Sequence, residues 1–188
     1  MRIKKGSAKS ALLVGIFTVL LAFVIGIGSE IILNFLSSFW VGLVLLLIII
    51  FLGIFFDLLG TAVTAATAPP FNAMASKKIK GATQAVRLLN NAGKFANYCN
   101  DVIGDVCGTL SGAVGAGIVV KVLAAYPFID AALLSALITG CIAGLTVGGK
   151  AFGKNIALNY SNQVIFRVAV VMAFVEKKVP ITFFKNKI

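Results

Sequence analysis

The sequence predicts an all-α integral membrane protein with four transmembrane helices and amphipathic interfacial helices after the second and fourth of them. Of its 188 residues, 60% are hydrophobic and only 12% are charged, too few to cover a soluble globule. Four apolar runs come near or exceed the ~20 residues that a spanning helix needs. They are residues 11–35, 41–68, 102–126 and 131–149. With the N-terminus inside, all but one of the 17 Lys and Arg residues lie on the inner side, the exception being Lys121. The positive-inside rule therefore orients both termini toward the cytoplasm.

The first run follows a basic N-terminus, residues 1–10, and predicts an extra transmembrane helix over 11–36. A cleaved secretory signal over residues 1–29 is the alternative, and it would leave three helices with an external N-terminus. The apolar stretch is about 18 residues long, however, whereas a signal usually has 7 to 15. It also continues beyond Glu30. These features favour a retained helix.

Two short connections are predicted on the outer side, and they hold Glu30 and Asp130. Aromatic residues lie beside both: Phe39, Trp40, Tyr126 and Phe128. Aromatic residues gather at membrane interfaces, so this pattern agrees with the charge-based orientation.

The second run ends at Pro69 and Pro70, where a helix cannot easily continue. Polar and apolar residues then alternate at helical spacing over 76–95, with a basic face. This predicts a cytoplasmic amphipathic helical hairpin over 71–98 along the inner membrane surface, with a break near Asn90, Asn91 and Gly93. A solvated cytoplasmic connector is the alternative.

The third and fourth runs each carry glycine at every fourth position, which lets helix backbones approach closely. These positions are Gly104, Gly108 and Gly112, and Gly140, Gly144 and Gly148. The two ridges are expected to pack on each other or on a second copy of the chain. After Gly149 the chain is polar to Gln163, and the apolar stretch 164–175 is interrupted by Arg167. As a helix this stretch spans only about 18 Å, so residues 155–188 are predicted to form interfacial helices.

Composition also bounds the function. The net charge of +11 is explained by attraction to an anionic inner leaflet, because the basic residues flank apolar runs. They do not form a separate basic arm, so no nucleic-acid partner is expected. The chain has no histidine and no phosphate-binding glycine loop, so it is not expected to be an enzyme. Its cysteines, Cys99, Cys107 and Cys141, lack metal-site spacing and are interpreted as apolar packing residues.

Carboxylates inside the apolar runs give the main indication of function, because an ionised Asp at mid-bilayer depth costs on the order of 3 kcal/mol. Asp57 shares a helix face with Gly60, Thr61 and Thr64. Asp101 and Asp105 are four residues apart, with Asn100 adjacent, and all these oxygen ligands could meet in the cytoplasmic half. Magnesium prefers such ligands. Alternatively, the carboxylates pair with Lys150 and Lys154, or Asp101 caps a helix at the interface.

From Phe55 onward, the order of these parts resembles the transmembrane domain of the CNNM/CorC (CorB) magnesium transporter family. Three segments carry the resemblance: Asp57-Leu58-Leu59-Gly60-Thr61-Ala62, then Cys99-Asn100-Asp101, then Gly149-Lys150-Ala151-Phe152-Gly153-Lys154 with Ile156-Ala157-Leu158-Asn159 after it. A CNNM/CorC-like domain over 41–188 is therefore expected, including the hairpin 71–98.

The resemblance implies a homodimer in the inner membrane that binds or moves a magnesium ion through a site in the cytoplasmic half, with no other cofactor. The resemblance implicates Asp57, Asn100 and Lys150, with the backbone near Gly149. Taken together with the oxygen ligands that share helix faces, the predicted metal-site residues are Asp57, Thr61, Asn100, Asp101 and Gly149, with Asp105 as an additional buried acid. Lys150 stands where the family has a glutamate, and an ammonium there would repel a divalent ion or serve as an internal counterion. The alternative is a non-transporting relative in which Lys150 replaces the ion and the basic inner face docks a lipid or protein partner, as a scaffold or regulator. A lytic or pore-forming peptide fits less well, because the chain is long and patterned with glycine.

Overall fold

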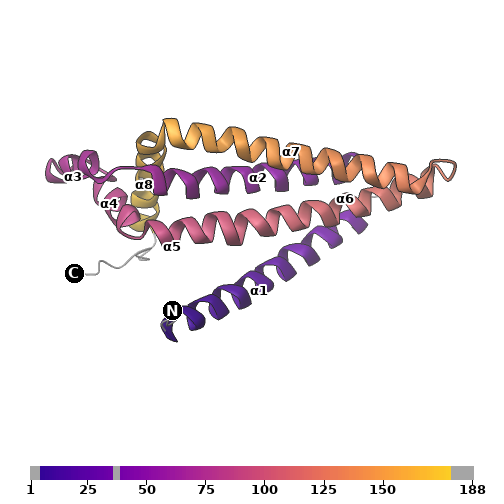
Figure 1. Ribbon diagram of the computed structural model, residues 1–188, viewed down its shortest axis with the longest axis horizontal. Helices are drawn as coiled ribbons and strands as arrows, with labels where there is room; N and C mark the ends of the chain where they lie inside the picture. Colours follow the sequence, from indigo (N-terminus) through magenta and orange to yellow (C-terminus); the bar gives the residue numbers. More distant parts are fainter. Residues whose placement is uncertain (1–4, 36–38, 179–188) are drawn as a thin grey trace. The chain divides into compact units, whose positions relative to one another are not determined.

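The computed structural model describes residues 5–35 and 39–178, and these are almost entirely helical, as predicted. In chain order the helices are α1 (Lys5–Phe35), α2 (Phe39–Ala65), α3 (Ala68–Ser76), α4 (Ala82–Asn90), α5 (Ala92–Asn97), the π-helix η1 (Tyr98–Gly104), α6 (Asp105–Ala125), α7 (Ala131–Asn159) and α8 (Ser161–Lys178) (Figure 1). Three predicted features lie outside the described residues: the start of the basic N-terminus 1–10, the side chain of Glu30, and the end of the segment 155–188.

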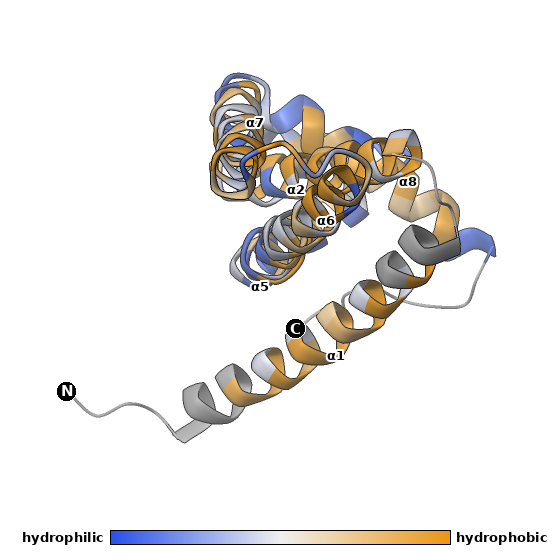
Figure 2. Ribbon diagram, turned by 90° about the vertical axis from the view of Figure 1, so that its right-hand side faces the viewer, coloured by the Kyte–Doolittle hydropathy of each residue, from blue (hydrophilic) through white to orange (hydrophobic). Residues whose placement is uncertain are grey.

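Three of the described helical stretches are long and apolar enough to cross a membrane: Phe39–Ala65, Ala92–Ala125 and Ala131–Asn159. They cover the second, third and fourth predicted runs. The first predicted run lies in α1, which Figure 2 colours as largely hydrophobic, but the apolar helical stretch described there, Leu12–Gly28, is shorter. That this first run also spans the membrane, which would make four spans, stays a prediction.

The chain divides into two compact units. The first unit combines the chain up to Ile54 with Val102–Gly149, and the second combines Phe55–Asp101 with the chain from Lys150 onward. The boundary therefore crosses α2, the π-helix η1 and α7. Each unit has an apolar core of its own.

In the first unit, α2, α6 and α7 run alongside one another (Figure 1), and α1 contacts α6. Their shared core consists of Leu46, Ile49 and Ile50 from α2, Val106, Cys107, Leu110, Val114 and Ile118 from α6, and Ile142 from α7. The close approaches occur at Gly53, where an added Cβ would lie 2.9 Å from Cys107 Cβ, and at Gly115, where it would overlap Ile142.

At five of the six ridge positions the two glycine ridges therefore do not pack on each other within the chain, and their packing on a second copy stays a prediction. An added Cβ at Gly108 or Gly112 in α6, or at Gly140, Gly144 or Gly148 in α7, would meet nothing within 4 Å. Apolar side chains of α6 occupy the helix faces that meet α2 and α7, because they bury more surface than glycine does.

Aromatic residues from the two predicted outer connections lie at one end of the first unit. Phe39 packs edge-on against Trp40, and Tyr126 does so against Phe128. All four line one hollow of about 710 Å³ together with Lys121. The start of α2 and the α6–α7 connection thus share an end, in agreement with the predicted topology.

In the second unit, α3 packs on α4, and α4 packs on α8. The core is built from small and branched side chains together with Phe71 of α3. The others are Ala62 and Val63 of α2, Ala85 and Leu88 of α4, Ala96 of α5, Ala157 of α7, and Ile165 and Ala169 of α8. Glu176 joins α8 to α4. Its carboxylate accepts a hydrogen bond from Gln84 Nε2 at 3.0 Å and lies 3.6 Å from the guanidinium of Arg87.

Helix ends in the second unit follow the prediction at some positions and depart from it at others. The predicted break falls at Asn91, between α4 and α5, and Asn91 donates a side-chain hydrogen bond to the Arg87 carbonyl at 3.0 Å. Helix α2 stops at Ala65, slightly early, and Pro69 and Pro70 belong to the first turn of α3, where proline needs no N–H donor.

The segment 71–98, predicted as one helix or a helical hairpin, is helical but more finely divided. The segment forms three short helices, with a turn between α3 and α4 in which Lys78 (φ 56°) and Gly81 (φ 89°) have left-handed backbones. From Ala92 the chain then continues as one helical stretch into the third span, which begins well before the predicted Val102.

The predicted end of the fourth helix at Gly149 is also wrong, because α7 continues to Asn159. No proline interrupts residues 150–159, and a single glycine such as Gly153 is tolerated inside a helix at a cost of about 1 kcal/mol. The interfacial segment therefore starts with α8 at Ser161. This continuity sets Lys150 and Lys154 one turn apart on the same helix.

Candidate functional site

Asp57 lies in α2 and has a buried side chain, as the sequence analysis expected. Its Oδ2 atom lies 3.7 Å from Lys154 Nζ, with the aspartate side chain 7% exposed and the lysine side chain 52% exposed. Lys154 reaches the carboxylate from the end of α7, and its long stem allows the ammonium to remain partly in water. The interpretation in which the carboxylate pairs with a lysine thus holds for Asp57, with Lys154 as its partner.

Asn100 lies in the π-helix η1, and its side chain packs directly on the backbone of Gly60 in α2. A Cβ added at Gly60 would overlap the Asn100 amide, coming within 2.6 Å of its Cγ atom. Only glycine at position 60 leaves room for this contact. Single-turn π segments inside α-helices often occur at functional sites.

Two acceptor oxygens, Asp57 Oδ2 and Asn100 Oδ1, are buried in this unit without a hydrogen-bond partner. Asp57 and Gly60 are three residues apart on α2, so they share a helix face, and Asn100 packs at the second of them. A buried acceptor without a donor is costly and rare. An oxygen pair of this kind can hold a hard cation, and Lys154 supplies a positive charge at the same carboxylate.

The threonine hydroxyls of α2 are not directed at this oxygen pair as donors. Thr61 Oγ1 donates to the main-chain oxygen of Asp57 at 2.8 Å, and Thr64 Oγ1 donates to the main-chain oxygen of Thr61 at 2.8 Å. Threonine in a helix commonly bonds to the preceding turn in this way. Thr61 therefore retains only lone pairs for a ligand.

Asp101 and Asp105 are exposed, so the prediction of Asp105 as a buried acid is wrong. In α6, Val106 and Leu110 are buried, whereas Asp105 is not. Apolar side chains of this helix take the core-facing positions and leave the carboxylate outside the core.

Gly149 and Lys150 lie on opposite sides of the unit boundary. Gly149 packs against Ile54, where an added Cβ would be 3.0 Å from Ile54 Cγ1. Lys150 is half-buried. Among the described residues there is no group of three or more His, Cys, Asp and Glu side chains that could hold a metal, so the oxygen pair would need waters or main-chain oxygens to complete a coordination shell.

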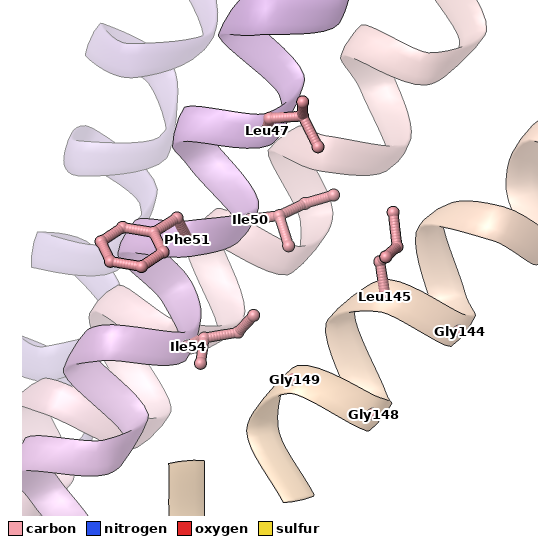
Figure 3. A pocket seen from close by; sticks show the side chains of 8 residues that line it. All are labelled: Leu47, Ile50, Phe51, Ile54, Gly144, Leu145, Gly148 and Gly149. Atoms are coloured by element: carbon pink, nitrogen blue, oxygen red, sulfur yellow. The ribbon is translucent and has the colours of Figure 1, made fainter. Parts of the chain in front are cut away.

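A groove of about 570 Å³ in the first unit has a different chemistry. Leu47, Ile50, Phe51 and Ile54 of α2 face Gly144, Leu145, Gly148 and Gly149 of α7 across it (Figure 3). None of these side chains carries a polar atom, so the groove offers no ligand to a cation.

The model of the cyclin M (CNNM) transmembrane N-terminal domain matches residues 43–187, which is most of the chain. The chain belongs to the CNNM family. No curated protein and no solved structure matches it. With its spanning helices, this CNNM-family chain is a multi-pass membrane protein, and α1 precedes the matched domain.

Within this CNNM domain, sequence reasoning found Asp57 and Asn100 but assigned the counterion role to Lys150. The continuity of α7 was the missing information, since it carries Lys154 to the carboxylate. The glycine in Asp57-Leu58-Leu59-Gly60 could have indicated where Asn100 packs, because a small residue one turn from a buried acid opens space for a second side chain.

Proposed function

We propose that this chain binds and moves a divalent cation, with magnesium the best candidate, through a site built on Asp57 and Asn100. The observation that carries the proposal is the pair of buried acceptor oxygens, Asp57 Oδ2 and Asn100 Oδ1, which have no hydrogen-bond donor. Membership of the CNNM family supports the cation as the ligand. Carboxylate and amide oxygens suit magnesium, which keeps several of its own waters.

In this proposal Lys154 is the internal counterion that holds the site when no ion is bound. Its ammonium lies 3.7 Å from Asp57 Oδ2 and is half exposed, so it can withdraw toward water as the cation arrives. The Lys154 ammonium and a magnesium ion would thereby compete for the Asp57 carboxylate.

A second candidate function follows from the same ion pair. If Lys154 stays in place, the chain is a non-transporting relative whose Asp57 is permanently neutralised and whose basic face docks a partner. The two candidates differ in whether magnesium displaces the lysine, and that difference can be measured.

The test uses the full chain in proteoliposomes, with a magnesium-sensitive dye inside, and in lipid nanodiscs for thermal unfolding. Transport predicts a magnesium flux in the wild type that Asp57→Asn and Asn100→Ala abolish. It also predicts a magnesium-dependent rise in Tm that is larger in Lys154→Gln. Lys177→Gln, an exposed lysine of α8, is the matched control and should behave as the wild type.

The non-transporting candidate predicts no flux and no magnesium effect in the wild type, with a magnesium-dependent rise in Tm only in Lys154→Gln. The absence of flux and of any magnesium effect in both proteins would remove the cation site altogether. If Asp57→Asn retains the magnesium flux, the transport site does not include the Asp57 carboxylate.

The same proposal places the chain in the cell membrane as a homodimer, with both termini and the α3–α5 segment in the cytoplasm, and assigns it no enzymatic activity. The clustering of outer-connection aromatic residues around one hollow supports the topology.

A further inference from the structure

A second groove lies in the second unit, between the end of α2 and α8, with a volume of about 470 Å³. Its α2 wall is formed by Phe55, Phe56, Leu58 and Leu59, and its α8 wall by Val164, Arg167, Val168, Val171 and Met172. Every lining residue but one is apolar. The exception, Arg167, interrupted the apolar stretch 164–175 in the sequence and had no assigned role.

Arg167 is exposed, and it makes no ion pair with any carboxylate of the described residues. The carboxylates of this unit that face basic side chains are already engaged, Asp57 with Lys154 and Glu176 with Arg87. A guanidinium therefore stands at an apolar groove without an acidic neighbour to neutralise it. Its methylene stem can line the groove while the charged head lies at the rim.

An apolar groove with a single cationic rim residue fits an amphiphile whose polar end is anionic. One wall is the end of a spanning helix, so the available amphiphiles of that chemistry are the phospholipids of the surrounding bilayer. The planar guanidinium donates two parallel hydrogen bonds to a phosphate, a geometry that lysine cannot reproduce.

We propose that the groove between α2 and α8 binds one anionic phospholipid, with its phosphate on Arg167 and an acyl chain along Phe55, Leu59 and Val171. An anionic headgroup is favoured over a zwitterionic one, since the chain carries a net charge of +11 and a headgroup amine would be repelled. The site is separate from the Asp57–Asn100 oxygens and goes beyond the proposed function.

Native mass spectrometry of the full chain, released from detergent with phosphatidylglycerol or phosphatidylcholine added, tests the proposal. The wild type is expected to retain one phosphatidylglycerol about tenfold more tightly than phosphatidylcholine. Arg167→Gln should abolish that preference, and Arg167→Lys should restore it only in part. Val171→Trp should fill the groove and prevent retention of either lipid, whereas Lys177→Gln on the same helix should bind as the wild type does.

Unchanged phosphatidylglycerol retention in both Arg167→Gln and Val171→Trp would overturn the proposal. Equal retention of the two lipids by the wild type would also overturn it, as would displacement of the lipid by inorganic phosphate, which would show that the rim binds any phosphate. If the variants instead change the mass of the assembly, a second copy of the chain fills the groove and the lipid assignment is wrong. Magnesium flux in the same variants separates the two proposals, because loss of the lipid preference leaves the Asp57 test unaffected.

Discussion

At the scale of single residues, the Asp57–Lys154 ion pair is asymmetric, and the asymmetry decides what each partner contributes. The carboxylate is buried, so it depends on a nearby positive charge, whereas the lysine is 52% exposed and can return its ammonium to water. Removing one partner of a buried pair is costly because of the charge left behind. In this pair, removal of Lys154 leaves the Asp57 carboxylate as an unpaired charge in a buried position, whereas removal of Asp57 leaves a lysine that is already half exposed.

Lys154→Gln is therefore expected to lower the free energy of unfolding by about 1–3 kcal/mol, and Asp57→Asn by less. Denaturant unfolding in a fixed detergent measures both, with Lys177→Gln as the exposed control, expected within about 0.5 kcal/mol of the wild type. The double variant should recover most of the loss. A larger loss in Asp57→Asn than in Lys154→Gln would contradict the assignment of the carboxylate as the dependent partner.

Gly60→Ala is expected to disturb the Asn100 contact directly, since the new methyl group would overlap the amide. Overpacking of this kind costs roughly 1–3 kcal/mol, and the displaced Asn100 should also reduce any magnesium-dependent rise in Tm. Gly112→Ala is the matched control, because an added Cβ there meets nothing within 4 Å. Identical thermal unfolding of the two variants would show that Asn100 does not pack on Gly60.

At the scale of elements, the second unit depends on how α8 is attached to the short helices. Gly81, at the start of α4, has φ 89°, and an added Cβ would lie 2.8 Å from Val170 Cγ2 in α8. The position therefore excludes a side chain for two reasons, the backbone conformation and the close approach of α8. Glu176 adds polar contacts to α4 further along the same helix.

Gly81→Ala is expected to destabilise the chain by about 1–3 kcal/mol through left-handed backbone strain together with the clash. Gly93→Ala should be neutral or slightly stabilising. Gly93 lies in α5, an added Cβ there would meet nothing within 4 Å, and its backbone is not left-handed. Chemical denaturation of the two variants makes the comparison. Equal stability would mean that α8 does not pack at Gly81.

Glu176→Ala should weaken the attachment of α4 to α8 without affecting the first unit. Amide hydrogen exchange is expected to rise several-fold in Ala82–Asn90 and to remain unchanged in α6, since the contacts of Glu176 with Gln84 and Arg87 join α8 to α4. Lys177→Ala, at the adjacent exposed position, is the control. Unchanged protection of α4 would show that the apolar contacts of the core suffice to hold it.

Sequence patterns located the helical segments well and their ends less well, for identifiable reasons. Hydrophobic runs marked the spanning helices because burial and lipid both demand them. The extension of α7 beyond Gly149 was missed because the spanning helix was ended where the apolar run ends, although polar residues continue a helix readily. The turn at Lys78–Gly81 was missed because the polar spacing of 76–95 satisfied a helix without it.

For the site, a buried Asp in an apolar run could be predicted, since its cost shows in the sequence alone. The contact of Asn100 with Gly60, the choice of Lys154 over Lys150 as the partner of Asp57, and the exposure of Asp101 and Asp105 could not. Each of these depends on how helices distant in the sequence pack and on where a π segment changes the helical register.

At the scale of the whole molecule, topology is the property that the proposed function needs most. Single cysteines introduced into a variant lacking Cys99, Cys107 and Cys141 can be labelled from either side of intact cells. Lys80→Cys is expected to react only after permeabilisation, and Phe128→Cys in intact cells, because the aromatic end is predicted to face outward. The reversed pattern would invert the orientation and place the Asp57 site toward the outer side.

The π-helix η1 gives the third span a property that an unbroken α-helix lacks. If Tyr98–Gly104 returned to α-helical hydrogen bonding, one residue would leave the widened turn, and the preceding part of the helix would rotate by about 100° relative to the rest. Asn100 lies inside that turn, so the rotation would carry its amide off the Gly60 surface. In the proposed cation site, such a change of hydrogen-bond register would remove the Asn100 oxygen, and backbone amide exchange across Tyr98–Gly104, measured with and without magnesium, would detect it.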